Sequence, residues 1–93
     1  MPIIIKPNIL EKLDTKHAVC GREVEQCFDN RTLGLLRDAR EQHQTNPPTM
    51  WFIAPTNQNR LLKVVFLQDG DDIYIKTAYE PNAIELRIYM EHA

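Results

Sequence analysis

A lysine inside an apolar strand is the first candidate for chemistry in this sequence. Lys63 interrupts the apolar run Leu61–Leu67, which is typical of a central strand. Its ammonium group could hold an anion, or it could be an exposed sheet lysine that deters edge-to-edge pairing. The chain has no glycine-rich phosphate loop, HExxH, CxxC or GxSxG, so no general motif decides between these two roles.

A second set of polar side chains lies on the last expected strand. Side chains alternate along a strand, so Thr77 and Tyr79 are predicted to share one face with Ile73 and Ile75. The same alternation predicts that Lys76 lies on the other face. What these side chains can do therefore depends on which face of the sheet the helices leave open.

The two cysteines indicate neither a disulfide nor a metal site. Cys20 and Cys27 lie seven residues apart in one expected helix, which separates them by roughly 10 Å along its axis, too far for a disulfide. We interpret them as reduced, packing residues of a cytoplasmic protein. With three scattered histidines they form no metal-ligand spacing, so we expect neither a metal nor a cofactor.

The composition is that of one small globular domain over residues 1–93, with 43% hydrophobic and 26% charged residues. No apolar run approaches the ~18–20 residues that span a bilayer, so no membrane partner is expected. The net charge of −2 argues against a general nucleic-acid coat, although an RNA-cutting site needs only a local basic cluster. A chain this short often gains stability from a partner, and a homodimer is one alternative.

The pattern of breakers and apolar residues predicts an α+β fold: two N-terminal helices, a four-stranded antiparallel meander sheet and a C-terminal helix. The expected elements are a short strand Ile3–Ile5, a helix Ile9–Lys16, a helix from Cys20 to Asp29–Asn30, strands Leu33–Arg37, Met50–Ala54, Leu61–Leu67 and Ile73–Tyr79, and a helix after Pro81–Asn82. Asn8 is the expected N-cap of the first helix, and Cys20 with Glu23 forms a capping box for the second. Asp38–Pro48 is expected to be an exposed loop.

The last helix carries apolar residues in two stripes. The broad stripe, which should pack on the sheet, consists of Ala83, Leu86, Tyr89, Met90 and Ala93. Ile84 and Ile88 lie nearly opposite, one helical turn apart. This pair predicts a docking surface for a partner protein, and the alternative is a contact within the same domain, such as one with the N-terminal helix.

Several short motifs follow one another from Lys16 onward. They are Lys16-His17-Ala18-Val19 with Glu23, Phe28 and Asp29; Trp51-Phe52-Ile53; Arg60-Leu61-Leu62-Lys63-Val64-Val65-Phe66; and Thr77-Ala78 followed by Glu85-x-Arg87-x-Tyr89. In order and spacing, they resemble the second helix, the sheet, the last strand and the last helix of BrnT-type toxins. The resemblance covers most of the chain after its first fifteen residues.

The BrnT resemblance implies a RelE-like fold within the RelE/ParE superfamily and the toxin role of a type II toxin–antitoxin system. The toxin would be an endoribonuclease, ribosome-linked or free, that inhibits translation. A cognate antitoxin would bind it tightly and repress their shared operon. Two other functions stay open: a non-catalytic interaction domain or degenerate toxin that acts only as a binding partner, and a small enzyme on another substrate.

Cleavage of RNA through the neighbouring 2′-hydroxyl needs a base for that hydroxyl, cations at the phosphate and an acid for the leaving oxygen. The candidates for these catalytic roles are Lys63, Arg87, Glu85 and His17, and the candidate RNA-binding residues are Arg60, Thr77, Tyr79 and Tyr89. Lys63 and Arg87 are predicted to lie within reach of each other beside Thr77. Ile84 and Ile88 are the candidate partner-binding residues.

Each of these residues also has a structural interpretation. His17 could interact with the dipole at a helix terminus. Arg87 could pair with Glu91 one helical turn away. Tyr79 and Tyr89 could pack at the edge of the core. Trp51 is expected to pack, with stacking on a base as the alternative.

Overall fold

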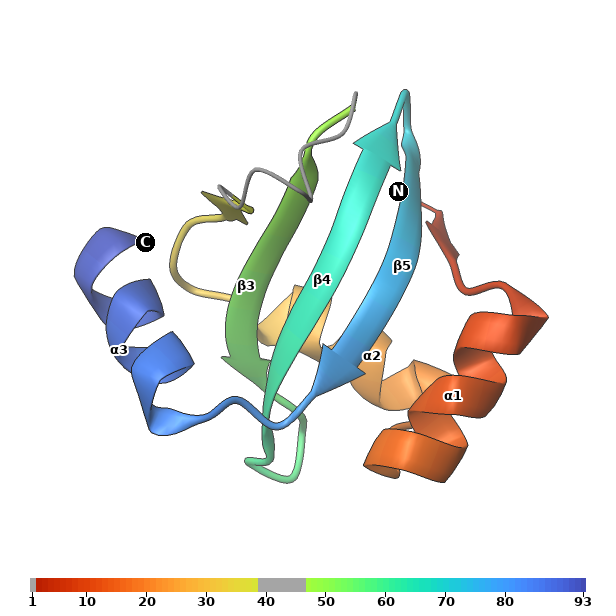
Figure 1. The fold of residues 1–93 in the computed structure, drawn as a ribbon, viewed down its shortest axis with the longest axis horizontal. Coiled ribbons are helices and arrows are strands. Elements are labelled where there is room, and N and C mark those ends of the chain that lie inside the picture. Colours follow the sequence, from red (N-terminus) through yellow and green to blue (C-terminus); the bar gives the residue numbers. More distant parts are fainter. Residues whose placement is uncertain (1, 39–46) are drawn as a thin grey trace.

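A computed structural model describes residues 2–38 and 47–93 of the chain. The elements run in the order β1 (Ile3–Ile4), α1 (Pro7–His17), α2 (Gly21–Asn30), β2 (Leu36–Arg37), β3 (Thr49–Pro55), β4 (Leu61–Asp69), β5 (Asp72–Tyr79) and α3 (Ala83–His92). The α+β class and the antiparallel meander from β2 to β5 agree with the sequence prediction. Figure 1 shows the three long strands of the meander, with α3 beside β3, α1 at the β5 side and α2 behind the strands.

The sheet has five strands in the order β1-β5-β4-β3-β2, so the prediction of a four-stranded antiparallel sheet was wrong. The additional strand, β1, pairs in parallel with β5 through Ile3 opposite Ile73. The backbone N–H of Ile73 also donates to the Pro2 carbonyl at 2.9 Å. A two-residue strand gives no local sign of its partner, because this pairing joins segments about seventy residues apart.

The main core lies between the sheet and helices α1 and α2. The inward side chains of the three long strands, including Phe52, Phe66 and Ala78, are almost fully buried. Phe28 of α2 packs edge-on against Phe52 and Phe66, at ring-centroid distances of 4.8 and 5.3 Å. Such edge-to-face pairs favour one arrangement of the rings, so they fix α2 on this side of the sheet. We call this side the covered face.

Among the described residues, a helix covers the opposite side of the sheet, which we call the open face, only along β3. Helix α3 lies beside β3 in Figure 1 and leaves this face of β4 and β5 without a helix over it. Tyr89 of α3 is 2% exposed, and its hydroxyl donates to the Gly34 carbonyl at 2.7 Å. Its ring lies 5.7 Å from that of Trp51. These contacts attach the second half of α3 to β3 and to the segment before β2.

A β-bulge in β5 changes the face on which its last residues lie. Val65 pairs with Thr77, whereas the next residue, Phe66, pairs with Ile75, so Lys76 is the extra residue on β5. A bulge inserts one residue and reverses the alternation of faces beyond it. The prediction that Thr77 and Tyr79 share a face with Ile73 and Ile75 was therefore wrong. Those isoleucines are buried on the covered face.

The bulge moves Thr77 and Tyr79 to the face that carries Lys63, because Tyr79 pairs directly with Lys63 and Thr77 with Val65. Cross-strand partners point to the same side of a sheet. Lys76, predicted to lie opposite Thr77, lines the same hollow as Thr77 on the open face. The bulge thus gathers polar side chains that strict alternation would have separated.

The starts of the first two helices follow different local rules. Helix α1 begins at Pro7 with Lys6 as its N-cap, so the expected cap at Asn8 was wrong. Proline is well suited to the first helical position because its φ is already helical and it lacks the N–H that would be left unpaired there. Helix α2 begins after Cys20, and the capping box with Glu23 is confirmed.

Two other expected boundaries differ from the structure. Strand β2 contains only the last two residues of the expected strand Leu33–Arg37, and Leu33 and Leu35 are 37% and 38% exposed. The segment before β2 instead approaches α3, where Gly34 accepts the Tyr89 hydroxyl. Most of the expected loop Asp38–Pro48 lies outside the described residues.

The broad apolar stripe of α3 was only partly correct. Tyr89 is buried, and Leu86 and Ala93 pack at the edge of the core, but Met90 is 63% exposed and Ala83 is also exposed. Only a narrow side of α3 touches the sheet, because the helix lies beside β3 and does not cross over the strands. The helix begins after Pro81–Asn82 as expected, and Asn82 caps it, with its side chain accepting from the Glu85 N–H at 2.8 Å.

Candidate functional site

Three of the predicted site residues meet at one point on the open face. The Lys63 ammonium from β4 donates to Glu85 Oε2 of α3 at 2.7 Å, and the Tyr79 hydroxyl from β5 donates to the same oxygen at 2.8 Å. We call these three residues the Lys63 cluster. Tyr79 lies opposite Lys63 in the sheet register, and the capping box at the start of α3 aims Glu85 toward both.

The two oxygens of Glu85 have separate partners. Oε1 accepts the backbone N–H of Asn82 at 3.0 Å, which completes the capping box, while Oε2 accepts from Lys63 and Tyr79. Locking one oxygen in the helix start fixes the direction of the other. The carboxylate is therefore held in position before any ligand arrives.

Aromatic rings surround the ammonium group of Lys63. Its Nζ lies 4.5 Å from the ring centroid of Trp51 and 5.7 Å from that of Tyr79. Cations are attracted to the faces of such rings, most strongly to tryptophan. On its other side Tyr79 contacts the ring of His17 at the end of α1, with 5.5 Å between centroids. His17 thus joins the border of the site from a fourth element.

Hydrogen bonds to Glu85 shift the pKa values of the titratable groups in the Lys63 cluster. Burial acts to raise the pKa of Glu85, but hydrogen bonds from Lys63, Asn82 and Tyr79 outweigh it, and the pKa lies below its ordinary value of 4.5. Burial, together with the hydrogen bond to Glu85, raises the pKa of Tyr79 above 10.0. At neutral pH the carboxylate is therefore ionised and the phenol keeps its proton.

The cluster borders two hollows on the open face. The larger, about 650 Å³, has Trp51, Ile88 and Leu36 among its walls and Arg37, Asp38 and His92 at its polar rim. The smaller, about 260 Å³, extends over β5 past Thr77 to Lys76. Lys63, Trp51 and Asp38 line both hollows. A ligand that spans both would therefore pass directly over the Lys63 ammonium.

The structure brings together five of the eight candidate catalytic and RNA-binding residues. They are Lys63, Glu85, Tyr79, Thr77 and His17. An acid–base pair, a cation and a hydroxyl around two hollows that share Lys63 can bind an anionic ester and move a proton at it. The remaining three, Arg60, Arg87 and Tyr89, lie elsewhere.

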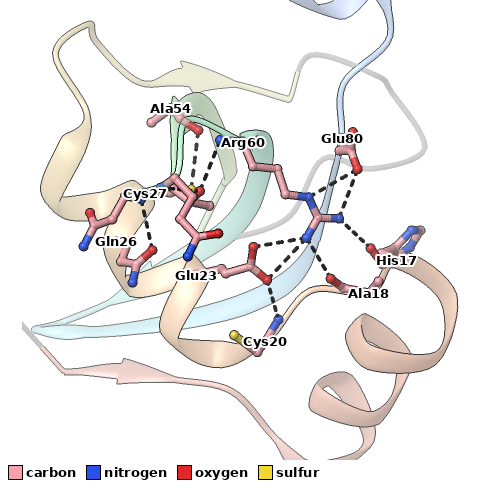
Figure 2. Close-up of polar contacts among 12 residues, drawn as sticks. His17, Ala18, Cys20, Glu23, Gln26, Cys27, Ala54, Arg60 and Glu80 are labelled. Atoms are coloured by element: carbon pink, nitrogen blue, oxygen red, sulfur yellow. Dashed lines mark hydrogen bonds and ion pairs between the residues drawn. The ribbon is translucent and has the colours of Figure 1, made fainter.

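Arg60 lies at the centre of a separate network that we call the Arg60 cluster, shown in Figure 2. Its guanidinium donates to the carbonyls of His17 and Ala18 at 2.9 and 2.7 Å. It also pairs with Glu23 and Glu80, both at 3.1 Å. These contacts join the end of α1, the start of α2 and the end of β5. With its donors used in this way, Arg60 acts as a positioning residue for the backbone at His17.

Arg87 does not join Lys63. It is exposed on α3 and lines neither hollow beside Lys63. It lies two positions after Glu85, and at 100° per residue this turns it to a different side of the helix. Tyr89, predicted to bind RNA, is instead buried against Trp51 and Gly34, so its hydroxyl and ring are used in packing.

Several residues of the site were missed at the sequence level. Trp51 was expected mainly to pack, yet its ring lies against the Lys63 ammonium. Lys76 lies on the face opposite Ile73 and Ile75, as alternation predicts, but it was not recognised as a residue of the site, and its Nζ lies 3.4 Å from Thr49 Oγ1. Asp38, 8% exposed, lines both hollows. To predict that Lys63 lies beside Trp51 and Tyr79 requires the register of the strands, which the sequence alone does not give.

Within residues 2–38 and 47–93, no group of three or more His, Cys, Asp or Glu side chains is placed to hold a metal ion. None of the helices in this part of the chain is long and apolar enough to cross a membrane. The Cys27 thiol is buried, which raises its pKa to about 12, and it donates to the Ala54 carbonyl at 3.4 Å. It is therefore a packing residue.

No family model and no curated protein matches the chain.

Arg60→Ala is expected to destabilise the fold, because it removes the donors to the end of α1 and leaves Glu23 without its cation. Hydrogen bonds to charged groups contribute about 1.5–3 kcal/mol, so we expect a loss of about 2–3 kcal/mol in the free energy of unfolding. Urea denaturation measures it. Arg87→Ala is the matched control and should change stability by less than about 0.5 kcal/mol. Equal stability of the two variants would contradict the positioning role.

The protein is expected to lose stability in acid through Glu85 and Glu23. Burial opposes ionisation of Glu23 too, but hydrogen bonds from Cys20 and Arg60 hold its pKa below 4.5. A carboxyl with a lowered folded-state pKa stabilises the fold above its unfolded-state pKa, and this contribution disappears as the pH falls below it. The urea midpoint should therefore drop between about pH 5 and pH 3.

Glu85→Gln should have a lower midpoint at neutral pH and a shallower fall in acid. Glu91→Gln, a change at an exposed carboxylate on the same helix, should follow the wild type. If Glu85→Gln keeps the full acid dependence, the Lys63–Glu85 pair is not its source.

Proposed function

We propose that this protein is the toxin of a type II toxin–antitoxin pair, with a RelE-like fold, and that it inhibits translation by cutting RNA at the Lys63 cluster. The observation that carries the proposal is the convergence of Lys63, Tyr79 and Glu85 from three elements beside two hollows. The element order gives further support: two helices, an antiparallel meander and a C-terminal helix, as the BrnT resemblance implies.

The cluster suits cleavage through the 2′-hydroxyl. Glu85 Oε2 would take the proton of the 2′-hydroxyl while its oxygen attacks the phosphorus, and Tyr79 would give its proton to the leaving 5′-oxygen. The products are a 2′,3′-cyclic phosphate and a 5′-hydroxyl. Glu85 then returns its proton to Tyr79 along the 2.8 Å hydrogen bond between them, which restores both groups.

Lys63 would stabilise the negative charge that develops on the phosphate. In the free protein its charge is matched by Glu85 at 2.7 Å. When Glu85 becomes neutral on taking the proton, the Lys63 ammonium loses this partner and is directed at the phosphate oxygens. Its stabilisation would therefore be greatest in the transition state, which is the condition for catalysis.

The cognate antitoxin would bind over Ile84 and Ile88. Both isoleucines are solvent-accessible, 70% and 42%, which argues against the alternative of a contact within the same domain. Ile88 also lines the larger hollow beside Lys63 and Glu85. A protein docked on this pair would cover the mouth of the site, so binding and neutralisation would be one event. We place the pair of proteins in the cytoplasm, with RNA, free or on the ribosome, as substrate.

A non-catalytic interaction domain is the second candidate function. The observation in its favour is that the Lys63 charge is already matched by Glu85 within a chain of net charge −2. In that case the cluster would serve only to attach α3 to the sheet. The experiment below separates the two functions.

Induced expression without a partner should stop bacterial growth and protein synthesis. Lys63→Ala should relieve this effect, since removal of one such electrostatic group slows catalysis roughly 10²–10³-fold. Arg87→Ala, which removes an exposed cation away from the cluster, should stay toxic. The measurements are growth curves, labelled amino-acid incorporation and cleavage of RNA by the purified protein. Normal growth at high, folded expression of the wild type would favour the non-catalytic function.

Ile84→Asp with Ile88→Asp should abolish binding of the antitoxin while the isolated toxin keeps its melting temperature, because both side chains are exposed on α3. Co-purification of the two proteins from one operon tests binding, and thermal unfolding of the toxin alone tests the fold. Met90→Asp, a change at another exposed apolar residue of α3, is the control and should still bind. A large fall in melting temperature of the double variant would show that the isoleucines stabilise the domain itself.

A further inference from the structure

A second cation, Lys76, shares the open face with Thr77 and Tyr79 because of the bulge in β5. Lys76 Nζ lies 3.4 Å from Thr49 Oγ1 of β3, so its side chain extends across β4. It lines the smaller hollow together with Lys63. Bulges are frequent beside functional sites, where they redirect a side chain. Lys76, and not Arg87, is thus the second cation beside Thr77.

A third hollow, of about 490 Å³, continues beyond Lys76. Its walls include Tyr74 and aliphatic side chains of β1 and α1, and Lys6 stands at its border with Lys76. Among the described residues that line it there is no carboxylate. Three lysines, Lys63, Lys76 and Lys6, therefore follow one another along two adjoining hollows.

The spacing of these cations fits a chain of phosphates better than a single one. The Lys76 ammonium lies beside Thr49, which pairs with Leu67, whereas the Lys63 ammonium is held at Glu85. Leu67 and Lys63 are four residues apart on β4, which is roughly 13 Å along a strand. One phosphate would not reach both ammonium groups in direct contact at that distance. Successive phosphates of an extended strand would reach each lysine in turn.

We propose that Lys76, Tyr74 and Lys6 form a track that binds the single-stranded RNA leading away from the scissile phosphate at Lys63. This proposal rests on the proposed function and assigns the substrate path. Lys76 and Lys6 bind backbone phosphates, and the half-buried ring of Tyr74 offers a surface on which a base stacks.

Binding of a short 2′-O-methyl oligoribonucleotide tests the track, because this probe lacks the 2′-hydroxyl and cannot be cut by the proposed chemistry. Affinity is measured by fluorescence anisotropy over a range of salt concentrations. Lys76→Gln and Lys6→Gln should each weaken binding and reduce the log–log salt slope by about 0.7, the value for one lost phosphate contact on a single strand. Lys6 makes no side-chain cap bond, so its replacement leaves α1 intact.

Two further variants sharpen the test. Tyr74→Leu should weaken binding on the order of fivefold or more through lost stacking while the salt slope stays unchanged. Lys12→Gln, at an exposed lysine of α1 that borders none of the three hollows, should bind like the wild type.

The proposal is overturned if the wild type does not bind the probe, or if Lys76→Gln and Lys6→Gln behave like Lys12→Gln. Cleavage of unmodified RNA by the same preparations separates this failure from failure of the proposed function. Cleavage that survives in all track variants with unchanged KM would leave the toxin function standing and remove the track. Salt-dependent binding of the probe without cleavage of unmodified RNA would support the track and contradict the proposed nuclease activity.

Discussion

The ion pair between Lys63 and Glu85 is the interaction on which the open face depends. It joins the centre of the sheet to the first turn of α3 at 2.7 Å, with side chains only 13% and 19% exposed. Removing one partner of such a pair leaves the other charge poorly solvated, which costs more than the pair itself contributes. Tyr79 and Asn82 satisfy the remaining capacity of Glu85, and Trp51 covers Lys63. The position of α3, and with it the shape of the larger hollow, follows from this contact.

The Arg60 cluster supports the same site from the other side of the sheet. By holding the carbonyls of His17 and Ala18, it fixes the end of α1, where Ala18 adopts a left-handed φ of 52°. His17 can then lie against Tyr79, which in turn bonds Glu85. Arg60 thus holds backbone carbonyls in place, whereas Lys63 faces a cavity. Two positively charged residues three positions apart, one just before β4 and one within it, have separate roles because Arg60 is surrounded by fixed acceptors and Lys63 is beside open space.

Local signals were enough to predict much of the fold. The capping box at Cys20, the start of the last helix after Pro81–Asn82 and the apolar run of β4 all depend on neighbouring residues, and the structure has each of them. The parallel pairing of Ile3 and the bulge at Lys76 depend on register between distant segments, so the sequence did not predict them. The same difference between local and long-range information applies to the candidate site. Lys63 and Glu85 were identified from their residue types. Arg87 and Tyr89 were assigned to the wrong place, because the rotation of α3 about its own axis relative to the sheet depends on tertiary packing.

The divided carboxylate of Glu85 has a consequence for how this site would change over evolutionary time. One oxygen belongs to the helix start and the other to the cluster, so selection for a well-formed α3 alone would preserve a glutamate here. A descendant that had lost its chemistry could keep this residue for generations. Tyr79 has no comparable second duty in its hydrogen bonding, since its hydroxyl contacts Glu85. Among related sequences, substitution of Tyr79 would therefore indicate loss of activity sooner than substitution of Glu85.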